Sequence, residues 1–291
     1  MSRRSAAERA VGGHTTPYLL LLPAGLLCAI IAICSIAVLR MSFGELGAEW
    51  TGWTLVNYRA LLEPFYLRIL FTTIWLAALS AVLTVVVAFP VALFMVRTRS
   101  DLLRRVVLIA VLLPMLVSLL VQSFGWVAIL GPDGLLNRTV APLTGHPRTF
   151  SLLFNRTGVL LGLIQTSIPL AVLPLASALR MIDSTLEEAA SVLGASRWQT
   201  YRDIIVPLSR PGLTAGLILV FGFNVGAFVV PLLLGGIKVT TVAMVIRDQM
   251  GPLLNWPLGS ALSVVLICLA TGIQMIHRWF FAPRDGMTRH G

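Results

Sequence analysis

The chain has 291 residues, of which 57% are hydrophobic and only 12% charged, and its mean hydropathy is +0.89. Soluble domains carry roughly 25% charged residues, so this composition indicates a membrane protein. The formal net charge of +10 would also suit a nucleic-acid-binding protein, but here the basic residues punctuate apolar runs instead of gathering on one polar face. We therefore expect contact with membrane lipids and no nucleic acid partner.

Six apolar runs without a charge are long enough to cross about 30 Å of hydrocarbon as helices. They are Tyr18–Leu39, Ile69–Val96, Val106–Leu130, Thr157–Leu179, Gly212–Leu234 and Gly259–Ile276. The first run follows Arg3 and Arg4, as a signal peptide would, but it is too long and lacks a small-x-small cleavage site, so we expect an uncleaved span. The sequence predicts an all-α polytopic membrane protein of six transmembrane helices over residues 18–280, with tails at residues 1–17 and 281–291.

The loops between these runs predict the orientation. The side that includes both termini carries 14 arginines, against eight arginines and lysines on the other side. Because basic residues are retained in the cytoplasm, both termini are predicted to be cytoplasmic. The outer loops are then Gly44–Trp53, Gly131–Pro147 and Gly235–Pro257, the last with a short interfacial helix at residues 246–250.

The three cysteines lie inside apolar runs and the four histidines are scattered, so no disulfide, metal site or cofactor is predicted.

A polar stretch at residues 180–211 separates the fourth and fifth runs. Ser184-Thr-Leu-Glu187 has the S-x-x-E form of a capping box, which predicts the start of a helix. Gly194 should end that helix, because glycine adopts the left-handed conformation without steric penalty. Ser196–Gln199 repeats the capping pattern and predicts a second helix, which runs toward Ile204 before Pro207 and Pro211 break it.

Both short helices are predicted to be amphipathic. Ala189 and Ala190 beside Gly194 form a low surface that suits insertion into a groove of another protein. The alternative is an interfacial connector that rests on lipid headgroups.

The same stretch resembles a family motif. Glu188-Ala189-Ala190, followed by Gly194, Ile204 and Pro207, resembles the EAA motif of inner-membrane permeases in binding-protein-dependent ABC importers, with Val206 where leucine is usual. Further stretches resemble the spermidine/putrescine branch of this family: Asn57–Arg59 with Leu67-Arg68, Leu130–Asn137, Gly226–Pro231, Asp248-Gln249 and Asn255–Gly259. The resemblance covers residues 17–280.

The resemblance implies a type I ABC importer permease fold with a cytoplasmic coupling helix between spans four and five. It implies that the Gly194 bend docks in a cleft of a separate ATPase subunit, of which two form a dimer. The residues expected to serve this coupling are Glu187, Glu188, Ala189, Ala190, Gly194, Arg197, Arg202, Ile204 and Pro207. The implied partners also include a second, similar permease chain and an extracytoplasmic solute-binding protein in the bacterial inner membrane system.

The chain itself is not expected to be the ATPase, because it has no G-x-x-x-x-G-K-[ST] phosphate loop. Nor is it expected to be an enzyme of another kind, because no Cys/His pair or pair of carboxylates lies within the runs. The cargo implied by the resemblance is a small solute, with a polyamine such as spermidine or putrescine favoured. The rival class is an ion-gradient-driven secondary transporter, which usually has intramembrane acids, broken helices or internal repeats.

Polar side chains within the runs nominate the solute pathway, since they are costly unless they face other helices or water. The candidates are Gln122, Ser123, Trp126, Gln165, Thr166 and Asn224. The alternative for each is a hydrogen bond between helices. Asn224 is favoured because it lies near mid-span, within the small-residue motif Gly222-x-x-x-Gly226.

All twelve acidic residues lie outside the six runs, so the pathway through this chain carries no negative charge. A polycation would favour carboxylates or aromatic faces along its route. Either selection rests with the binding protein and the second permease chain, or the cargo is a different small solute.

Overall fold

The computed structural model describes residues 16–46, 52–144 and 151–281, so the predicted tails lie largely outside the described residues. Over the described ranges the chain contains helices and no strand, which confirms the all-α prediction. The α-helices are α1 (Thr16–Ser42), α2 (Val56–Ala60), α3 (Pro64–Arg97), α4 (Asp101–Leu116), α5 (Leu119–Leu130), α6 (Leu135–Thr144), α7 (Arg156–Arg180), α8 (Thr185–Val192), α9 (Arg197–Thr200), α10 (Val206–Leu208), α11 (Arg210–Val225), α12 (Val242–Met250) and α13 (Trp256–Phe281). Two π-helical turns, η1 (Tyr201–Ile205) and η2 (Pro231–Gly235), and a 3-10 turn, η3 (Gly236–Lys238), complete the set.

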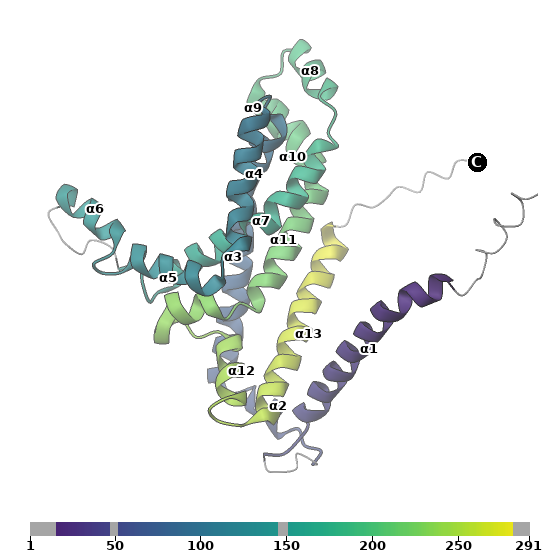
Figure 1. The fold of residues 1–291 in the computed structure, drawn as a ribbon, viewed down its shortest axis with the longest axis vertical. Helices are drawn as coiled ribbons and strands as arrows, with labels where there is room; N and C mark the ends of the chain where they lie inside the picture. Colours follow the sequence, from purple (N-terminus) through teal and green to yellow (C-terminus); the bar gives the residue numbers. More distant parts are fainter. Residues whose placement is uncertain (1–15, 47–51, 145–150, 282–291) are drawn as a thin grey trace, which may run out of the picture.

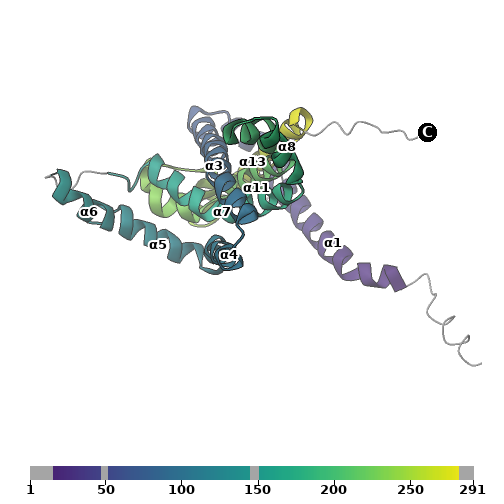
Figure 2. The ribbon, with the colours of Figure 1, turned by 90° about the horizontal axis from the view of Figure 1, so that it is seen from above.

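Helices α3, α7 and α11 pack together as the core of the molecule (Figures 1 and 2). Small residues let them approach closely: a Cβ at Gly212 of α11 would lie 2.6 Å from Ala178 Cβ and 3.0 Å from the Pro174 carbonyl oxygen of α7. In α3, Ala77 and Ala81 are fully buried. Such small contacts are the means by which helices associate in lipid, where no hydrophobic drive exists between them.

Helix α1 stands apart from this core and contacts α13 (Figure 1). Its described side chains up to Leu39 are mostly exposed and apolar, as expected for a helix in lipid. Its carboxyl end is held by α2, where Asn57 Nδ2 donates to the carbonyls of Ser42 (3.0 Å) and Gly44 (2.8 Å). Tyr58 Oη lies 2.6 Å from Ser42 Oγ, which fixes the same corner.

Four of the six predicted spans are confirmed as α1, α3, α7 and α13. By length and apolarity, five helical stretches of the described chain could cross a membrane, or six if one bent pair counts as a span. The five are Leu22–Ser42, Pro64–Arg97, Leu119–Pro142, Arg156–Arg180 and Trp256–His277, and the bent pair is Arg197–Leu208 with Arg210–Val225.

The prediction of one continuous span at Val106–Leu130 is wrong. Helix α4 ends at Leu116, Val117 and Ser118 are extended, and α5 and α6 then point away from the core (Figure 1). The Gln122 side chain donates to the carbonyls of Pro114 and Val117 and so supplies bonds that the broken backbone lacks. Such breaks are tolerated in a membrane when side chains satisfy the freed backbone groups.

The prediction of one span at Gly212–Leu234 is also wrong. Helix α11 ends at Val225, where the N–H groups of Gly226 and Ala227 both bond to the Asn224 carbonyl. The apolar residues that follow form the separate turn η2. The residues that follow Gly226 are also apolar, so the hydropathy pattern contained no sign that the helix ends there.

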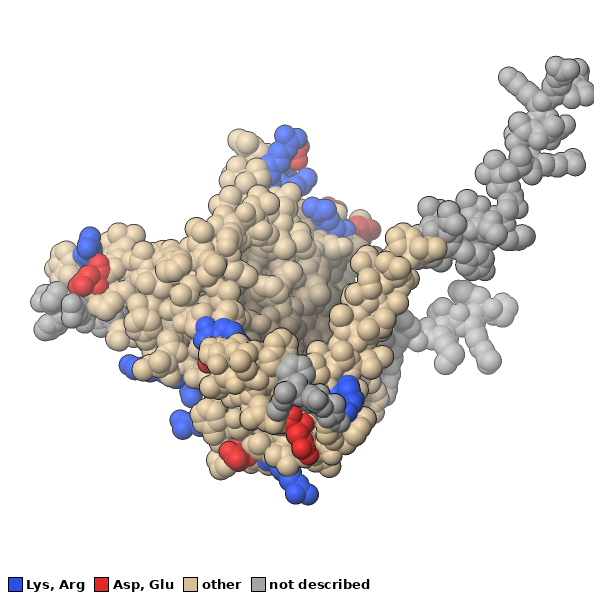
Figure 3. Space-filling model, turned by 60° about the horizontal axis from the view of Figure 1, so that its bottom comes forward, with Lys and Arg blue, Asp and Glu red and all other residues tan. Residues whose placement is uncertain are grey.

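The expected helix at residues 246–250 is found and is longer, because α12 begins at Val242; its position at the membrane interface stays a prediction. Its first N–H donates to Thr73 Oγ1 of α3 at 2.9 Å. Charged side chains form small separate patches on a largely uncharged surface (Figure 3).

Candidate functional site

The polar stretch forms a bent helical loop at one end of the molecule, with α8 at its extremity (Figure 1). Gly194 has a φ of +84°, a conformation that side chains rarely adopt. Its N–H bonds to the Ser191 carbonyl (3.0 Å), and the Ala195 N–H bonds to the Ala190 carbonyl (2.9 Å). These two bonds form a Schellman motif, so the prediction that the helix ends at Gly194 is confirmed.

The predicted capping box at Ser184 and Glu187 is wrong. Ser184 is helical and its side chain makes no cap bond, whereas Asp183 Oδ1 accepts from the Thr185 N–H at 3.0 Å. That hydrogen bond lowers the pKa of the Asp183 carboxyl below its ordinary value. Glu187 does not reach back to the cap, because its carboxylate binds the guanidinium of Arg97 at the end of α3.

The second capping box is confirmed. Ser196 Oγ accepts from the Gln199 N–H at 3.3 Å, and Gln199 Oε1 accepts from the Ser196 N–H at 2.7 Å. The helix that starts here passes Pro207 and reaches Leu208, so the prediction that Pro207 breaks it is wrong. The π-helical turn η1 explains this, since the Val206 N–H already bonds back to Tyr201 one residue farther than usual.

The true break lies at buried Ser209, where the helical axis bends by 63° into α11.

The tip of the loop is apolar. Val192 and Leu193, just before the bend, are each 87% exposed, and Trp198 follows at 68%. Trp198 stacks on Tyr201, whose ring packs edge-on against Phe89 of α3. The sequence had indicated Ala189 and Ala190 as the docking surface, but Ala190 is buried within the loop while Ala189 is exposed.

The charged residues predicted to serve coupling fall into two groups. Glu188, Arg197 and Arg202 are exposed, with Arg202 Nε lying 3.2 Å from Asp203 Oδ1. Glu187, in contrast, is held by Arg97, and both side chains are 29% exposed. Ile204 and Pro207 are half-buried, and the fully buried neighbour is Ile205. The predicted site did not include Val192, Leu193 and Arg97. Gly194, which follows Val192 and Leu193, was the signal that could have pointed to these two residues.

The predicted pathway residues do not converge on one site. Gln122 caps the break between α4 and α5, and Ser123 is buried with its hydroxyl bonded to the Leu119 carbonyl (2.7 Å). Trp126 Nε1 donates to Gln165 Oε1 at 3.2 Å and so joins α5 to α7. The Thr166 hydroxyl bonds to the Gly162 carbonyl of its own helix at 3.0 Å.

Asn224 lies deep in the core. Its Nδ2 donates to Ser80 Oγ and its Oδ1 accepts from Ser167 Oγ, each at 2.8 Å, so one amide joins α3, α7 and α11. The two glycines of the predicted small-residue motif do not pack around Asn224. Gly222 faces Gln274 of α13, and Gly226 caps the end of α11. A pathway role for Asn224 stays a prediction that requires this network to open.

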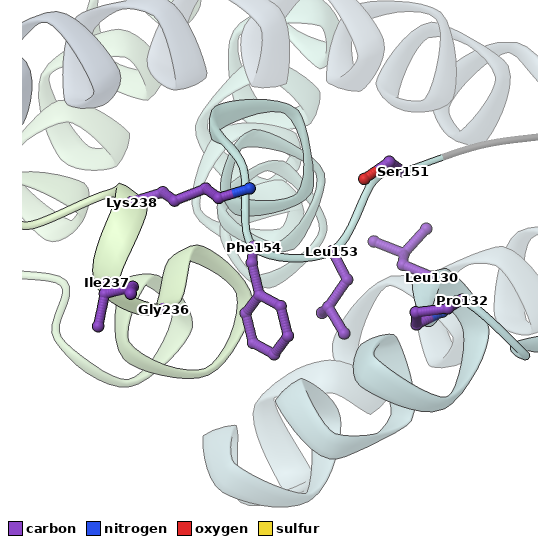
Figure 4. A pocket seen from close by; sticks show the side chains of 8 residues that line it. All are labelled: Leu130, Pro132, Ser151, Leu153, Phe154, Gly236, Ile237 and Lys238. Carbon is purple, nitrogen blue, oxygen red and sulfur yellow. The ribbon is translucent and has the colours of Figure 1, made fainter.

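Two cavities bear on the pathway. One of 230 Å³ lies where the breaks of α4–α5 and α11–η2 meet; Leu119, Gly226 and Thr166 line it, and Thr166 is the one predicted pathway residue that does so. The other, of 610 Å³, lies between η3 and the α5–α6 turn. There Phe154 and Leu153 stand between Ile237 on one side and Leu130 and Pro132 on the other (Figure 4). No predicted pathway residue lines this larger cavity.

Comparison with known proteins then decides the family. Residues 82–282 match the model of the binding-protein-dependent transport system inner membrane component. The chain belongs to this family.

This permease is 32% identical to the spermidine/putrescine transport system permease protein PotB of Escherichia coli over 226 residues, which cover 78% of this chain and 82% of PotB. It is 36% identical to the molybdenum transport system permease protein ModB of Azotobacter vinelandii over 61% of this chain and 77% of ModB. Its fold is similar to that of a chain in a bacterial ABC transporter that imports the acidic polysaccharide alginate, with a TM-score of 0.78, 19% identity and coverage of 92% and 96%.

The family and the helices together identify a multi-pass inner-membrane permease of the type I ABC importer fold, which is a transport component and not an enzyme. The gradient-driven alternative is not favoured, although two spans prove to be broken.

Proposed function

We propose that this permease forms half of the translocation pathway of an ATP-driven polyamine importer, with a second permease chain as the other half. An extracytoplasmic binding protein delivers the solute, and an ATPase dimer on the cytoplasmic side receives the α8 loop. Both termini are then cytoplasmic. The coupling residues are those predicted in the loop, with Glu188, Arg197 and Arg202 among its exposed charges.

The observation that carries the coupling proposal is the exposed tip formed by Val192, Leu193 and Gly194. An apolar pair that is 87% exposed, at the end of a capped helix and outside the apolar spans, suits a hydrophobic groove on a partner protein. The left-handed Gly194 sets the angle at which this pair is presented.

Substitution at Gly194 tests this proposal. No atom lies within 4 Å of a Cβ built there, so a side chain meets no clash but must adopt the left-handed conformation. Asparagine tolerates that conformation, whereas valine resists it by about 1–2 kcal/mol or more. We expect Gly194→Val to lose the ATPase subunit in a mild-detergent pull-down because of the strained backbone, and Gly194→Asp to lose it because of the charge added beside the apolar tip, while Gly194→Asn retains it. Equal recovery of the ATPase with all three variants would contradict the docking proposal.

The polyamine assignment is supported by the identity to PotB, which extends over most of both chains. A second candidate cargo is an oxyanion, favoured by the similarity to ModB and by the lack of any acidic residue in the six apolar runs. The two are separated by uptake into proteoliposomes that hold the whole complex and its binding protein. Uptake of labelled spermidine supports the first candidate, and uptake of molybdate without spermidine replaces it with the second.

A further inference from the structure

We propose that Arg97 is a positioning residue which ties the coupling loop to α3 through Glu187, so that all three core helices are anchored to α8. This inference rests on the proposed function, because it concerns how motion of the loop reaches the membrane. It also gives Glu187 a role inside the chain instead of a contact with the ATPase.

The chain itself makes two of the three ties. Helix α7 leads into α8 through residues 181–184, and α8 leads through residues 193–196 into α9, η1 and α10, and so into α11. Helix α3 has no such connection, since Arg97 and Glu187 are 90 residues apart. Tyr201 of the loop packs against Phe89 of α3, but the ion pair is the side-chain bond that joins α3 to α8 itself.

The loop depends on this tie because α8 is otherwise lightly held. Among the residues of α8, Ala190 is the buried one, whereas Leu186 and Val192 are exposed, as is Leu193 just after the helix. Within the described chain, the bond from Glu187 to Arg97 is the side-chain hydrogen bond that links α8 to a core helix. Without it, α8 could move while α3 stays in place.

The environment of Arg97 favours a fixed partner. Both side chains of the pair are 29% exposed, so water screens them less than it screens an open surface pair. The Arg97 Nε atom is buried without a hydrogen-bond partner, so the guanidinium already bears a cost of burial. Removal of Glu187 would leave this charge without its counterion, which is the unfavourable case for a partly buried pair.

The far end of the tie explains why it matters for transport. Helix α3 carries Ser80, which accepts from Asn224 of α11, and Asn224 in turn accepts from Ser167 of α7. The same three helices are thus linked at two levels, by the buried Asn224 amide and by their connections to α8. A displacement of α8 that is transmitted to all three helices moves them together, whereas a displacement transmitted to only two of them would break the hydrogen bonds of Asn224.

Charge reversal with rescue tests the proposal. The variants are Arg97→Glu, Glu187→Arg and the double reversal, with Arg99→Glu as the matched control, because Arg99 lies two residues after Arg97, between α3 and α4, and is exposed. Each is expressed with the full complex, and three quantities are measured: recovery of the ATPase subunit, ATP hydrolysis, and solute uptake per ATP hydrolysed.

We expect each single reversal to retain the ATPase and its hydrolysis but to lower uptake per ATP about tenfold, and the double reversal to recover most of the loss. Arg99→Glu should behave as the native chain. A variant that is lost from the membrane is replaced by Arg97→Gln or Glu187→Gln, for which the same loss of coupling is expected.

Three results would overturn the proposal. They are normal coupling in both single reversals, no recovery in the double reversal, or loss of the ATPase in Glu187→Arg alone, which would make Glu187 a contact of the ATPase. Absence of any ATPase from the native complex is a different result, since it contradicts the proposed function itself.

Discussion

Asn224 and Ser80 are 144 residues apart in the chain, yet 2.8 Å separates the amide nitrogen of one from the hydroxyl oxygen of the other in the buried core. With Ser167 on the opposite side, Asn224 satisfies both ends of its amide between helices. Buried polar bonds of this kind fix how helices are arranged, because any alternative arrangement leaves the groups without partners.

Replacement of Asn224 by leucine should therefore lower the free energy of unfolding by about 1–3 kcal/mol, since the buried Ser167 hydroxyl loses its acceptor and the Ser80 hydroxyl loses a donor. The measurement is unfolding of the detergent-solubilised chain, with uptake followed in parallel. Ser123→Ala is the control, because the Ser123 hydroxyl bonds only within its own helix. Unchanged stability would contradict the structural role, and unchanged uptake would exclude a role in the pathway.

Thr166 and Ser167 provide a matched pair for locating the pathway. Thr166 lines the 230 Å³ cavity at the two helix breaks, whereas Ser167 is fully buried against Asn224. In a chain whose three cysteines are replaced by alanine, Thr166→Cys should react with a small water-soluble thiol reagent, and the cargo should slow that reaction. Ser167→Cys should stay unreactive. Equal reactivity at the two positions would remove Thr166 from the pathway.

Gly212 should tolerate no side chain. A methyl group there would meet Ala178 and the Pro174 carbonyl of α7, so Gly212→Ala should lower stability by about 1–3 kcal/mol in spite of the better helix propensity of alanine. Gly272→Ala in α13 is the control, because no atom lies within 4 Å of its Cβ position. The comparison is made by thermal unfolding in detergent, and a stabilised Gly212→Ala would show that the contact can relax.

Asp183 should protect the first turn of α8. Asp183→Ala removes the acceptor for the Thr185 N–H, so amide exchange at the start of α8 should speed up, while Asp183→Asn should retain protection. Because the pKa of Asp183 lies below its ordinary value of 3.8, the contribution of the carboxylate is complete above that value and is lost only as pH falls through the lower pKa of the folded state. Amide exchange of native α8 should thus be independent of Asp183 ionisation at neutral pH, and a change near pH 7 that Asp183→Asn abolishes would contradict this.

Two features that depend on local chemistry were predicted correctly, although the cap at Ser184 and the break at Pro207 were not. Gly194 and the Ser196–Gln199 cap act through bonds between near neighbours, and both were found as expected. The helix breaks at Ser118 and Gly226 were missed, because the residues around them are apolar and a hydropathy pattern does not show where a helix changes direction. The pair of Arg97 with Glu187 was beyond reach, since it depends on how distant helices pack.

The 63° bend at Ser209 gives this permease the geometry of a lever. Gly212, which has no room for a side chain against α7, lies three residues after the bend. From the rise per residue, the arm at Arg197–Leu208 is about 18 Å long and the arm formed by α11 is about 24 Å. If both arms are rigid and rotate together about Ser209, the end of α11 at Val225 travels about one third farther than the start of the other arm at Arg197. The residues that travel farthest are then those at the break after α11, and those that move least lie beside the bend.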